Sequence, residues 1–223
     1  MEKAVAEMYA LQDTVLGIVF SLDNDFYLTG GTALHRFHVH GRYSNDLDFF
    51  APDDLRFGEN IKQVLDALTD NGVRFDRGVR TRDFHRLIVN DTLQVDFVND
   101  RVYRDGNSVI IQGMRIDNVR NILTNKLAAV MDRDEEKDIF DIFAIASHES
   151  FVWSEMLEIL QKKAPVEKEL LIERIRAFPL DWLSNLKILQ PLTVDKESIT
   201  RLCDDIARGG SNSFHGSDSG VRY

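Results

Sequence analysis

Hydrophobic residues change their spacing along the chain near residue 118. Before that point, short apolar runs are separated by Gly, Asn and Asp, a pattern typical of strands and turns mixed with helices. After it, apolar residues recur every three or four positions, as in amphipathic helices. We expect strands at residues 26–29, 47–50, 73–79, 84–89 and 93–98, with a hairpin turn at Asn90-Asp91. We expect helices at residues 3–22, 32–40, 61–68, 118–131, 134–147, 154–163, 167–178 and 196–207.

This change in spacing predicts an α+β architecture with a boundary near residue 118. Residues 1–117 are expected to form an α/β domain. Residues 118–208 are expected to form an all-helical domain, interrupted by Pro165, Pro179 and Pro191. Residues 209–223 are rich in glycine and serine, and we expect them to form a flexible tail.

The composition is that of an ordinary globular protein, with 43% hydrophobic and 29% charged residues in a chain of 223. The single cysteine, Cys203, excludes an internal disulfide and a cysteine-based zinc cluster. The first 22 residues include Glu2, Glu7 and Asp13, and their apolar run at residues 15–20 is too short to span a bilayer. We therefore expect a cytoplasmic protein without membrane contact.

The formal net charge of −10 argues against a protein that coats nucleic acid over its whole surface. The charge is unevenly distributed, however. Five arginines and only two aspartates lie between residues 74 and 86; the arginines are Arg74, Arg77, Arg80, Arg82 and Arg86. This stretch is either an RNA-backbone contact or a pair of surface strands with alternating charges.

A strand predicted to end at Thr29 runs into Gly30-Gly31-Thr32 and then a helix. Glycines at such a turn let the backbone approach a phosphate, and the first N–H groups of the helix attract negative charge. Thr32 adds a hydroxyl. The segment is a candidate nucleotide-binding turn, although a tight strand–helix connection explains the two glycines equally well.

Two aspartates, Asp46 and Asp48, are separated by one residue on a predicted strand. Their carboxylates therefore share one face, about 6–7 Å apart, while Leu47 and Phe49 face the core. Such a pair of hard oxygen ligands suits Mg²⁺ or Mn²⁺. The alternative is a solvent-facing pair at the end of a strand.

A third aspartate, Asp96, lies in a predicted strand whose other face carries Leu93, Val95 and Phe97. An acid in an apolar strand costs free energy unless it is paired or bound to metal. Three strand carboxylates behind a glycine turn suit two-metal nucleotidyl transfer. Asp46, Asp48 and Asp96 are therefore the predicted metal ligands and catalytic acids.

The same residues resemble a known motif set. Gly30-Gly31-Thr32, Arg42, Ser44, Asp46-Leu47-Asp48 and Asp96 resemble the nucleotidyltransferase superfamily, and the order of the motifs resembles its AbiEii/AbiGii toxin branch. That branch also has a lysine in a following helix and a basic-Asp-x-x-Asp motif, which Lys126 and Lys137-Asp138-Ile-Phe-Asp141 match. Lys137 stands where members usually have arginine. The resemblance covers roughly residues 28–146.

The resemblance implies a polymerase-beta-like mixed sheet with helices and an enzyme of a type IV toxin–antitoxin or abortive-infection system. It implies a nucleoside triphosphate substrate, an RNA acceptor with tRNA 3′ ends favoured, and a cognate antitoxin as partner. Asp46 and Asp48 would bind the metal, Asp96 would be the third carboxylate, and Asp138 an active-site acid. Lys126 would contact the triphosphate, and nucleotide binding would also involve Gly30, Gly31, Thr32, Arg42 and Ser44.

Two alternatives stay open on the sequence. The same metal site can modify a protein hydroxyl with a nucleotide, or the fold can serve as a non-catalytic nucleotide- or protein-binding module. Lys126 taken alone also reads as a surface lysine on an apolar helix.

Overall fold

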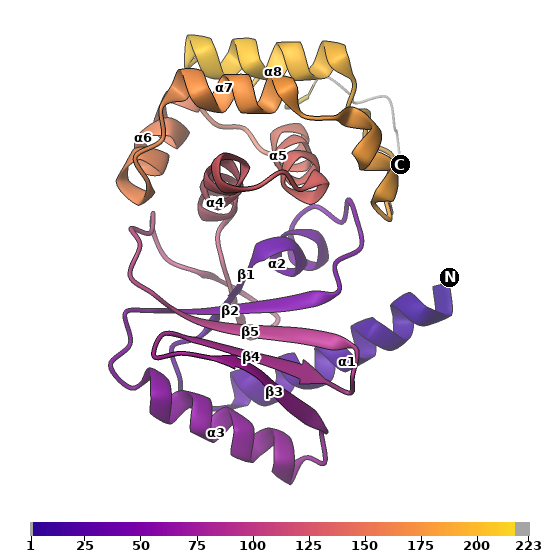
Figure 1. Cartoon of the computed structure of the whole chain (residues 1–223), viewed down its shortest axis with the longest axis vertical. Coiled ribbons are helices and arrows are strands. Elements are labelled where there is room, and N and C mark those ends of the chain that lie inside the picture. Colours follow the sequence, from indigo (N-terminus) through magenta and orange to yellow (C-terminus); the bar gives the residue numbers. More distant parts are fainter. Residues whose placement is uncertain (1, 217–223) are drawn as a thin grey trace. The chain divides into compact units, whose positions relative to one another are not determined.

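A computed structural model describes residues 2–216 of the chain (Figure 1). Its contacts divide the chain into two compact units. The sheet unit comprises Met1–Ala33, Ser44–Val102 and Asn107–Asp117, and the helical unit comprises Leu34–Tyr43, Tyr103–Gly106 and Asn118–Tyr223. Two short segments that precede residue 118 thus group with the later helices.

The sheet unit is built on seven strands in the order β3-β4-β5-β2-β1-β7-β6. The pairs β2–β5 and β1–β7 are parallel and the other neighbours are antiparallel, so the sheet is mixed. The expected α+β architecture is confirmed. The strands are β1 (Tyr27–Thr29), β2 (Asp46–Pro52), β3 (Phe75–Arg80), β4 (Phe84–Val89), β5 (Leu93–Asp100), β6 (Val109–Ile111) and β7 (Met114–Ile116).

One face of the sheet carries the apolar core, with α1 (Glu2–Ser21) and α3 (Phe57–Asp70) lying on the same side of it (Figure 1). Phe49 of β2 and Phe97 of β5 stack with their ring centroids 5.1 Å apart. Phe26 packs edge-on against Phe97 and against the first residue of α3. Because neighbouring strand residues point to opposite faces, the aspartates that alternate with these phenylalanines belong to the other face.

The hairpin between β4 and β5 turns at Asn90-Asp91, as predicted. Both residues have left-handed backbones, with φ of 48° and 60°. Asparagine and aspartate tolerate this conformation better than other residues with a Cβ, which explains why they stand here.

The helical unit contains five long helices and a 3₁₀ helix, η1 (Leu180–Asn185), among the residues described. The helices are α4 (Val119–Asp132), α5 (Glu136–His148), α6 (Trp153–Lys163), α7 (Lys168–Ala177) and α8 (Lys196–Arg208). All five match predicted helices to within two residues at each end. Asn118 caps α4 by accepting a hydrogen bond from the Asn121 backbone N–H.

The remaining helix, α2 (Gly30–Phe37), begins in the sheet unit and ends in the helical unit. It starts at Gly30, whereas the sequence predicted a start at residue 32. No helix among the described residues is long and apolar enough to cross a membrane.

The short elements and the tail also differ from the prediction. β6, β7 and η1 were not predicted, because each is short and β6 exposes Val109 and Ile110 without an alternating pattern. The tail predicted from residue 209 is packed as far as residue 214: Asn212 donates to the carbonyls of Ala146 and Glu149, and Phe214 packs against Phe143. Residues 217–223 lie outside the described residues.

Candidate active site

The three predicted carboxylates lie on one face of the sheet. Asp46 and Asp48 are on β2, Asp96 is on β5, and the parallel register places Asp48 directly beside Asp96. Leu47 and Phe49 are completely buried on the opposite face, as the alternation predicted. Neighbouring strands are about 4.8 Å apart, so the Asp48 and Asp96 side chains rise from adjacent positions.

Asp96 is neutralised by an arginine that the sequence analysis did not connect to it. Arg86 of β4 stands opposite Asp96 and donates two hydrogen bonds to its carboxylate, from Nε and Nη2, both 2.7 Å long. Gln94 adds a third at 3.1 Å. Hydrogen bonding to Asp96 raises the pKa of Arg86. This bidentate pair explains how an acid that is 93% buried is tolerated in an apolar strand.

Asp46 is held by uncharged groups. The Ser44 hydroxyl donates to its carboxylate at 3.0 Å, and the Thr32 hydroxyl donates to its backbone carbonyl at 2.6 Å. The Gln12 side chain bridges the carbonyls of Ser44 and Asp46. Two hydroxyls predicted to contact a nucleotide therefore fix the start of β2, where the first carboxylate stands.

Gly30 is required by the position of Asp48. A Cβ atom at residue 30 would lie 2.2 Å from Asp48 Oδ2, and the backbone there is left-handed with φ of 72°. Any other residue would displace the Asp48 carboxylate and strain the backbone, so both facts favour glycine. Gly30 is also the first residue of α2, so the Asp48 carboxylate lies against the N-terminal end of a helix, with Gly31 buried in the following position.

The fit of a divalent metal rests on these carboxylates. Among residues 2–216, no three His, Cys, Asp or Glu side chains are arranged to hold a metal ion. Asp96 is engaged by Arg86, while Asp46 and Asp48 form a partly exposed pair on one strand face. Two hard oxygen donors fit Mg²⁺ or Mn²⁺, which commonly keep water and phosphate oxygens as their other ligands.

The helical unit holds a second acid cluster, centred on Asp141. Its fully buried carboxylate accepts two hydrogen bonds from Arg42, at 2.7 and 2.8 Å, and one from His35 at 2.7 Å. Lys126 Nζ lies 2.7 Å from Asp141 Oδ2. Burial alone would raise the pKa of Asp141, but Lys126 and Arg42 hold it well below its usual value.

Asp138 lies one turn earlier on α5, on the same face of the helix. It accepts hydrogen bonds from Lys126 at 2.8 Å and from Arg133 at 2.8 and 3.2 Å. Burial tends to lower the pKa of Lys126, yet Asp141 and Asp138 outweigh burial and raise it. Lys126 is therefore a buried, permanently charged ammonium rather than a surface lysine.

Arg133 supplies the guanidinium that the family motif usually places beside this aspartate. Lys137, which occupies the motif position, turns to Glu135 at 2.9 Å. The departure from the motif is thus compensated by an arginine four residues earlier, on the other side of the α4–α5 connection.

His35 has a defined tautomer. Its Nδ1 accepts hydrogen bonds from the backbone N–H groups of Gly41 and Arg42, so Nε2 carries the proton donated to Asp141. Burial lowers the pKa of His35 in spite of Asp141. The imidazole is neutral at physiological pH and orients the carboxylate that also receives Arg42.

The predicted site residues therefore fall into two sets. Arg42, Lys126 and Asp138 meet in the helical unit, and the sheet unit holds Gly30, Gly31, Thr32, Ser44, Asp46, Asp48 and Asp96. The sequence analysis missed Arg86, Arg133 and His35 as partners of these acids. The one available signal was alternation along residues 84–89, which puts Arg86 on the face opposite Leu87 and Val89.

Comparison with known proteins extends this description. A family model described as nucleotidyl transferase AbiEii toxin, type IV TA system, matches residues 17–204. A putative nucleotidyltransferase from Helicobacter pylori superimposes with a TM-score of 0.65 at 22% identity, covering 93% of this chain and 95% of that one. JHP933 from Helicobacter pylori gives 0.63 at 22% identity, covering 92% and 91%.

MenT4, a nucleotidyltransferase toxin from Mycobacterium tuberculosis, gives a TM-score of 0.59 at 20% identity, covering 91% of this chain and 82% of that one. At these identities the structures establish a shared polymerase-beta-like nucleotidyltransferase fold. No curated protein matches the chain. The family model covers most of the sequence and both acid clusters, and the chain belongs to the AbiEii family of nucleotidyltransferase toxins of type IV toxin–antitoxin systems.

Proposed function

We propose that the chain transfers a nucleotide from a nucleoside triphosphate to an RNA acceptor, with the 3′ end of tRNA as the favoured acceptor. The observation that carries the proposal is the position of Asp46 and Asp48. They form a carboxylate pair on one strand face, with Asp48 against the glycine that opens α2. This arrangement places hard oxygen ligands beside a helix N-terminus that favours phosphate.

Asp46 and Asp48 are the proposed ligands of Mg²⁺ or Mn²⁺. The metal, when bound, supplies positive charge to the triphosphate and to the attacking hydroxyl. Ser44 and Thr32 keep Asp46 in place, and Gly30 leaves room for the Asp48 carboxylate. Gly31, the next residue of α2, also has no side chain.

Asp96 is the proposed third carboxylate. It is engaged by Arg86, so its entry into the metal site requires that Arg86 turn away. Since Arg86 is 36% exposed at its side chain, it has room to do so and to meet an incoming phosphate instead.

Lys126 is the proposed triphosphate contact of the helical unit. An ammonium has three N–H donors, and two of them point to Asp138 and Asp141. We propose that the third donates to a phosphate oxygen of the triphosphate. Asp138 and Asp141 fix the ammonium, and Arg42 acts through Asp141.

The proposal is tested with α-labelled nucleoside triphosphates, total tRNA and total protein, each incubated with the wild-type chain and with Asp48→Asn. Label in tRNA that depends on Asp48 supports it. Asp76→Asn, an exposed acid on β3, is the matched control and should label tRNA like wild type. Label that enters protein instead would favour modification of a protein hydroxyl, and label in neither would overturn RNA transfer.

A further inference from the structure

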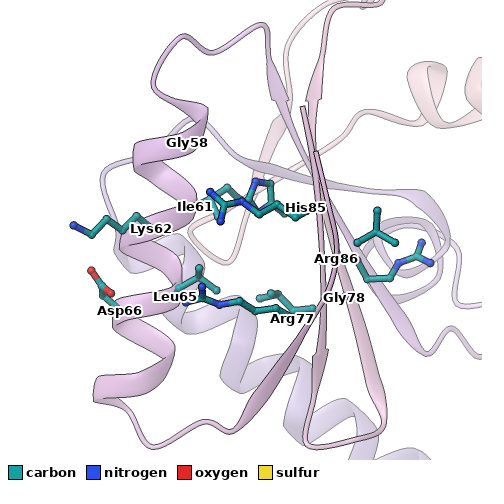
Figure 2. Close-up of a pocket in the computed structure, with 12 residues that line it drawn as sticks. Gly58, Ile61, Lys62, Leu65, Asp66, Arg77, Gly78, His85 and Arg86 are labelled. Carbon is teal, nitrogen blue, oxygen red and sulfur yellow. The ribbon is translucent and has the colours of Figure 1, made fainter. Parts of the chain in front are cut away.

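The sheet unit contains a groove on the face opposite the three carboxylates, between α3 and the β3–β4 hairpin. Figure 2 shows its lining, which encloses about 390 Å³. Its floor is apolar, formed by Ile61, Leu65 and Leu87, and its rim is polar. Of the lining residues, only Arg86 also takes part in the site described above, through its pair with Asp96.

Two arginines reach the same rim because β3 is irregular. Arg77 pairs with Leu87 and Arg80 pairs with His85, with a register shift between them. In a regular strand, residues three apart point to opposite faces. The bulge adds one residue and turns Arg80 to the side of Arg77. Figure 2 shows Arg77 and His85 directed toward α3, while Arg86 points to the other side of the sheet.

The electrostatics agree with this placement. Burial lowers the pKa of His85, and the charges of Arg80 and Arg77 lower it further, so both guanidinium groups lie near the ring. Three basic groups thus surround the apolar floor, and Lys62 and the acid Asp66 of α3 line the outer edge.

These cations differ from three other arginines of the sheet unit, each of which is paired with an acid. Arg74 is paired with Asp91, Arg86 with Asp96, and Arg101 with Asp53 and Asp83. Within residues 2–216, no carboxylate lies at ion-pair distance from Lys62, Arg77 or Arg80. In a chain of net charge −10, such a cluster is complementary to a polyanion.

We propose that this groove binds a single-stranded segment of the acceptor RNA, with phosphates at Arg77 and Arg80 and a base on the apolar floor. An open groove of this size holds one nucleotide, and the combination of cations with an apolar, ring-bearing surface suits single-stranded nucleic acid. The proposal rests on the proposed RNA transfer. Because the groove faces away from Asp48, it holds a nucleotide upstream of the reacting end, with the RNA passing around β3, the edge strand.

The test measures binding of a short unstructured RNA by fluorescence anisotropy at several salt concentrations. The groove variant is Arg77→Glu with Arg80→Glu; the matched control is Arg74→Glu with Arg101→Glu, which changes the charge equally outside the groove. Losing two phosphate contacts should weaken binding by roughly 25-fold at 0.1 M salt and reduce the slope of log K against log salt by about 1.4. The control should stay close to wild type. All four sites are exposed, and circular dichroism checks folding; Arg77→Gln with Arg80→Gln replaces the groove variant if it unfolds.

Transfer assays separate this proposal from the proposed function. The KM for tRNA should rise in step with the dissociation constant, and the loss should be larger for tRNA than for a dinucleotide acceptor. Unchanged RNA affinity and salt slope in the groove variant would overturn the groove assignment while leaving RNA transfer intact, and would leave a protein partner as the occupant. Equal losses in the control would also overturn it. Wild type that labels no RNA, but whose RNA binding is lost in the groove variant, would overturn RNA transfer and keep the groove.

Discussion

Asp138 and Asp141 of the helical unit and Asp46 of the sheet unit are the same side chain in different electrostatic settings. In the helical unit, Asp138 and Asp141 are completely buried and receive Lys126, Arg42 and Arg133. In the sheet unit, Asp46 is partly exposed and accepts a hydrogen bond from the neutral Ser44 hydroxyl. Within residues 2–216, no basic side chain lies at ion-pair distance from Asp46.

This difference in burial and charge pairing determines how each group of acids can act. When a buried carboxylate loses its cationic partner, an unpaired charge is left in the low-dielectric interior, which costs free energy. The acid cluster of the helical unit therefore keeps its geometry. A partly exposed carboxylate held only by a hydroxyl can accept a cation with little rearrangement. We therefore expect substitution of the buried Asp141 to act on folding, and substitution of the partly exposed Asp48 to act on chemistry.

The largest effect is expected for Asp141→Asn. The change leaves Lys126 and Arg42 without their shared buried carboxylate, which should lower the free energy of unfolding by about 3–5 kcal/mol. Denaturant unfolding followed by circular dichroism measures it. Asp204→Asn removes an exposed partner of Arg208 and should cost less than about 1 kcal/mol. Equal costs for the two variants would refute the contrast between buried and exposed acids.

Asp48→Asn should affect activity instead. Loss of a metal ligand should reduce transfer by about a hundredfold or more, equivalent to about 2.7 kcal/mol of transition-state stabilisation. Because Asp48 is only partly buried, the unfolding midpoint should change little. Steady-state transfer rates and a thermal melt of the same preparation measure both. Near-normal transfer by a folded variant would remove Asp48 from the catalytic site.

His35 should make the helical unit sensitive to acid. Burial holds the folded-state pKa of His35 below its usual value of 6.5, so the unfolded chain binds the proton more tightly. The stability that His35 confers is thus complete above about pH 6.5 and is lost as pH falls below it, by at most about 1.4 kcal/mol per pH unit.

Unfolding free energies at pH 7.5 and 5.5 test this expectation. His35→Gln should reduce the difference between the two values, although His85 contributes part of it because its pKa is lowered too. His148→Gln, at an exposed position, is the control and should leave the difference unchanged. An unaltered pH dependence in His35→Gln would show that the imidazole is not the titrating group.

The smallest effect is expected for Ser44→Ala. It removes one hydrogen bond to the Asp46 carboxylate, worth about 1 kcal/mol, and should reduce transfer by less than tenfold. Threonine at the same position keeps the hydroxyl and should restore part of the rate. A loss as large as that of Asp48→Asn would mean that Ser44 contacts the substrate directly.

Much of the fold and the acidic face could be predicted because both follow from local periodicity. Alternation along β2 and β5 is a property of the strand itself, and it correctly put Leu47 and Phe49 in the core. The partners of the acids depend on register and tertiary contact. A two-residue turn at Asn90-Asp91 would place Arg86 opposite Val95, whereas the observed pairing of Val89 with Leu93 places it opposite Asp96.

The acid cluster of the helical unit was harder to predict from the sequence. His35 and Asp141 are 106 residues apart, and no local pattern connects them. Arg133 lies in the connection that follows α4. Helix propensity does not determine the direction in which that connection runs. The motif indicated Asp138 and Lys126, but the side chains that neutralise them come from the folded arrangement.

The bulge in β3 implies that the length of this strand, as well as its composition, determines the distribution of charge. Deleting one residue there, such as Gly78, would restore regular alternation and move Arg80 to the carboxylate face without altering the net charge of the protein. Such a deletion would be isoelectric, yet it would divide Arg77 and Arg80 between the two faces of the hairpin. A single gap here would therefore disperse the groove cations even with every arginine retained.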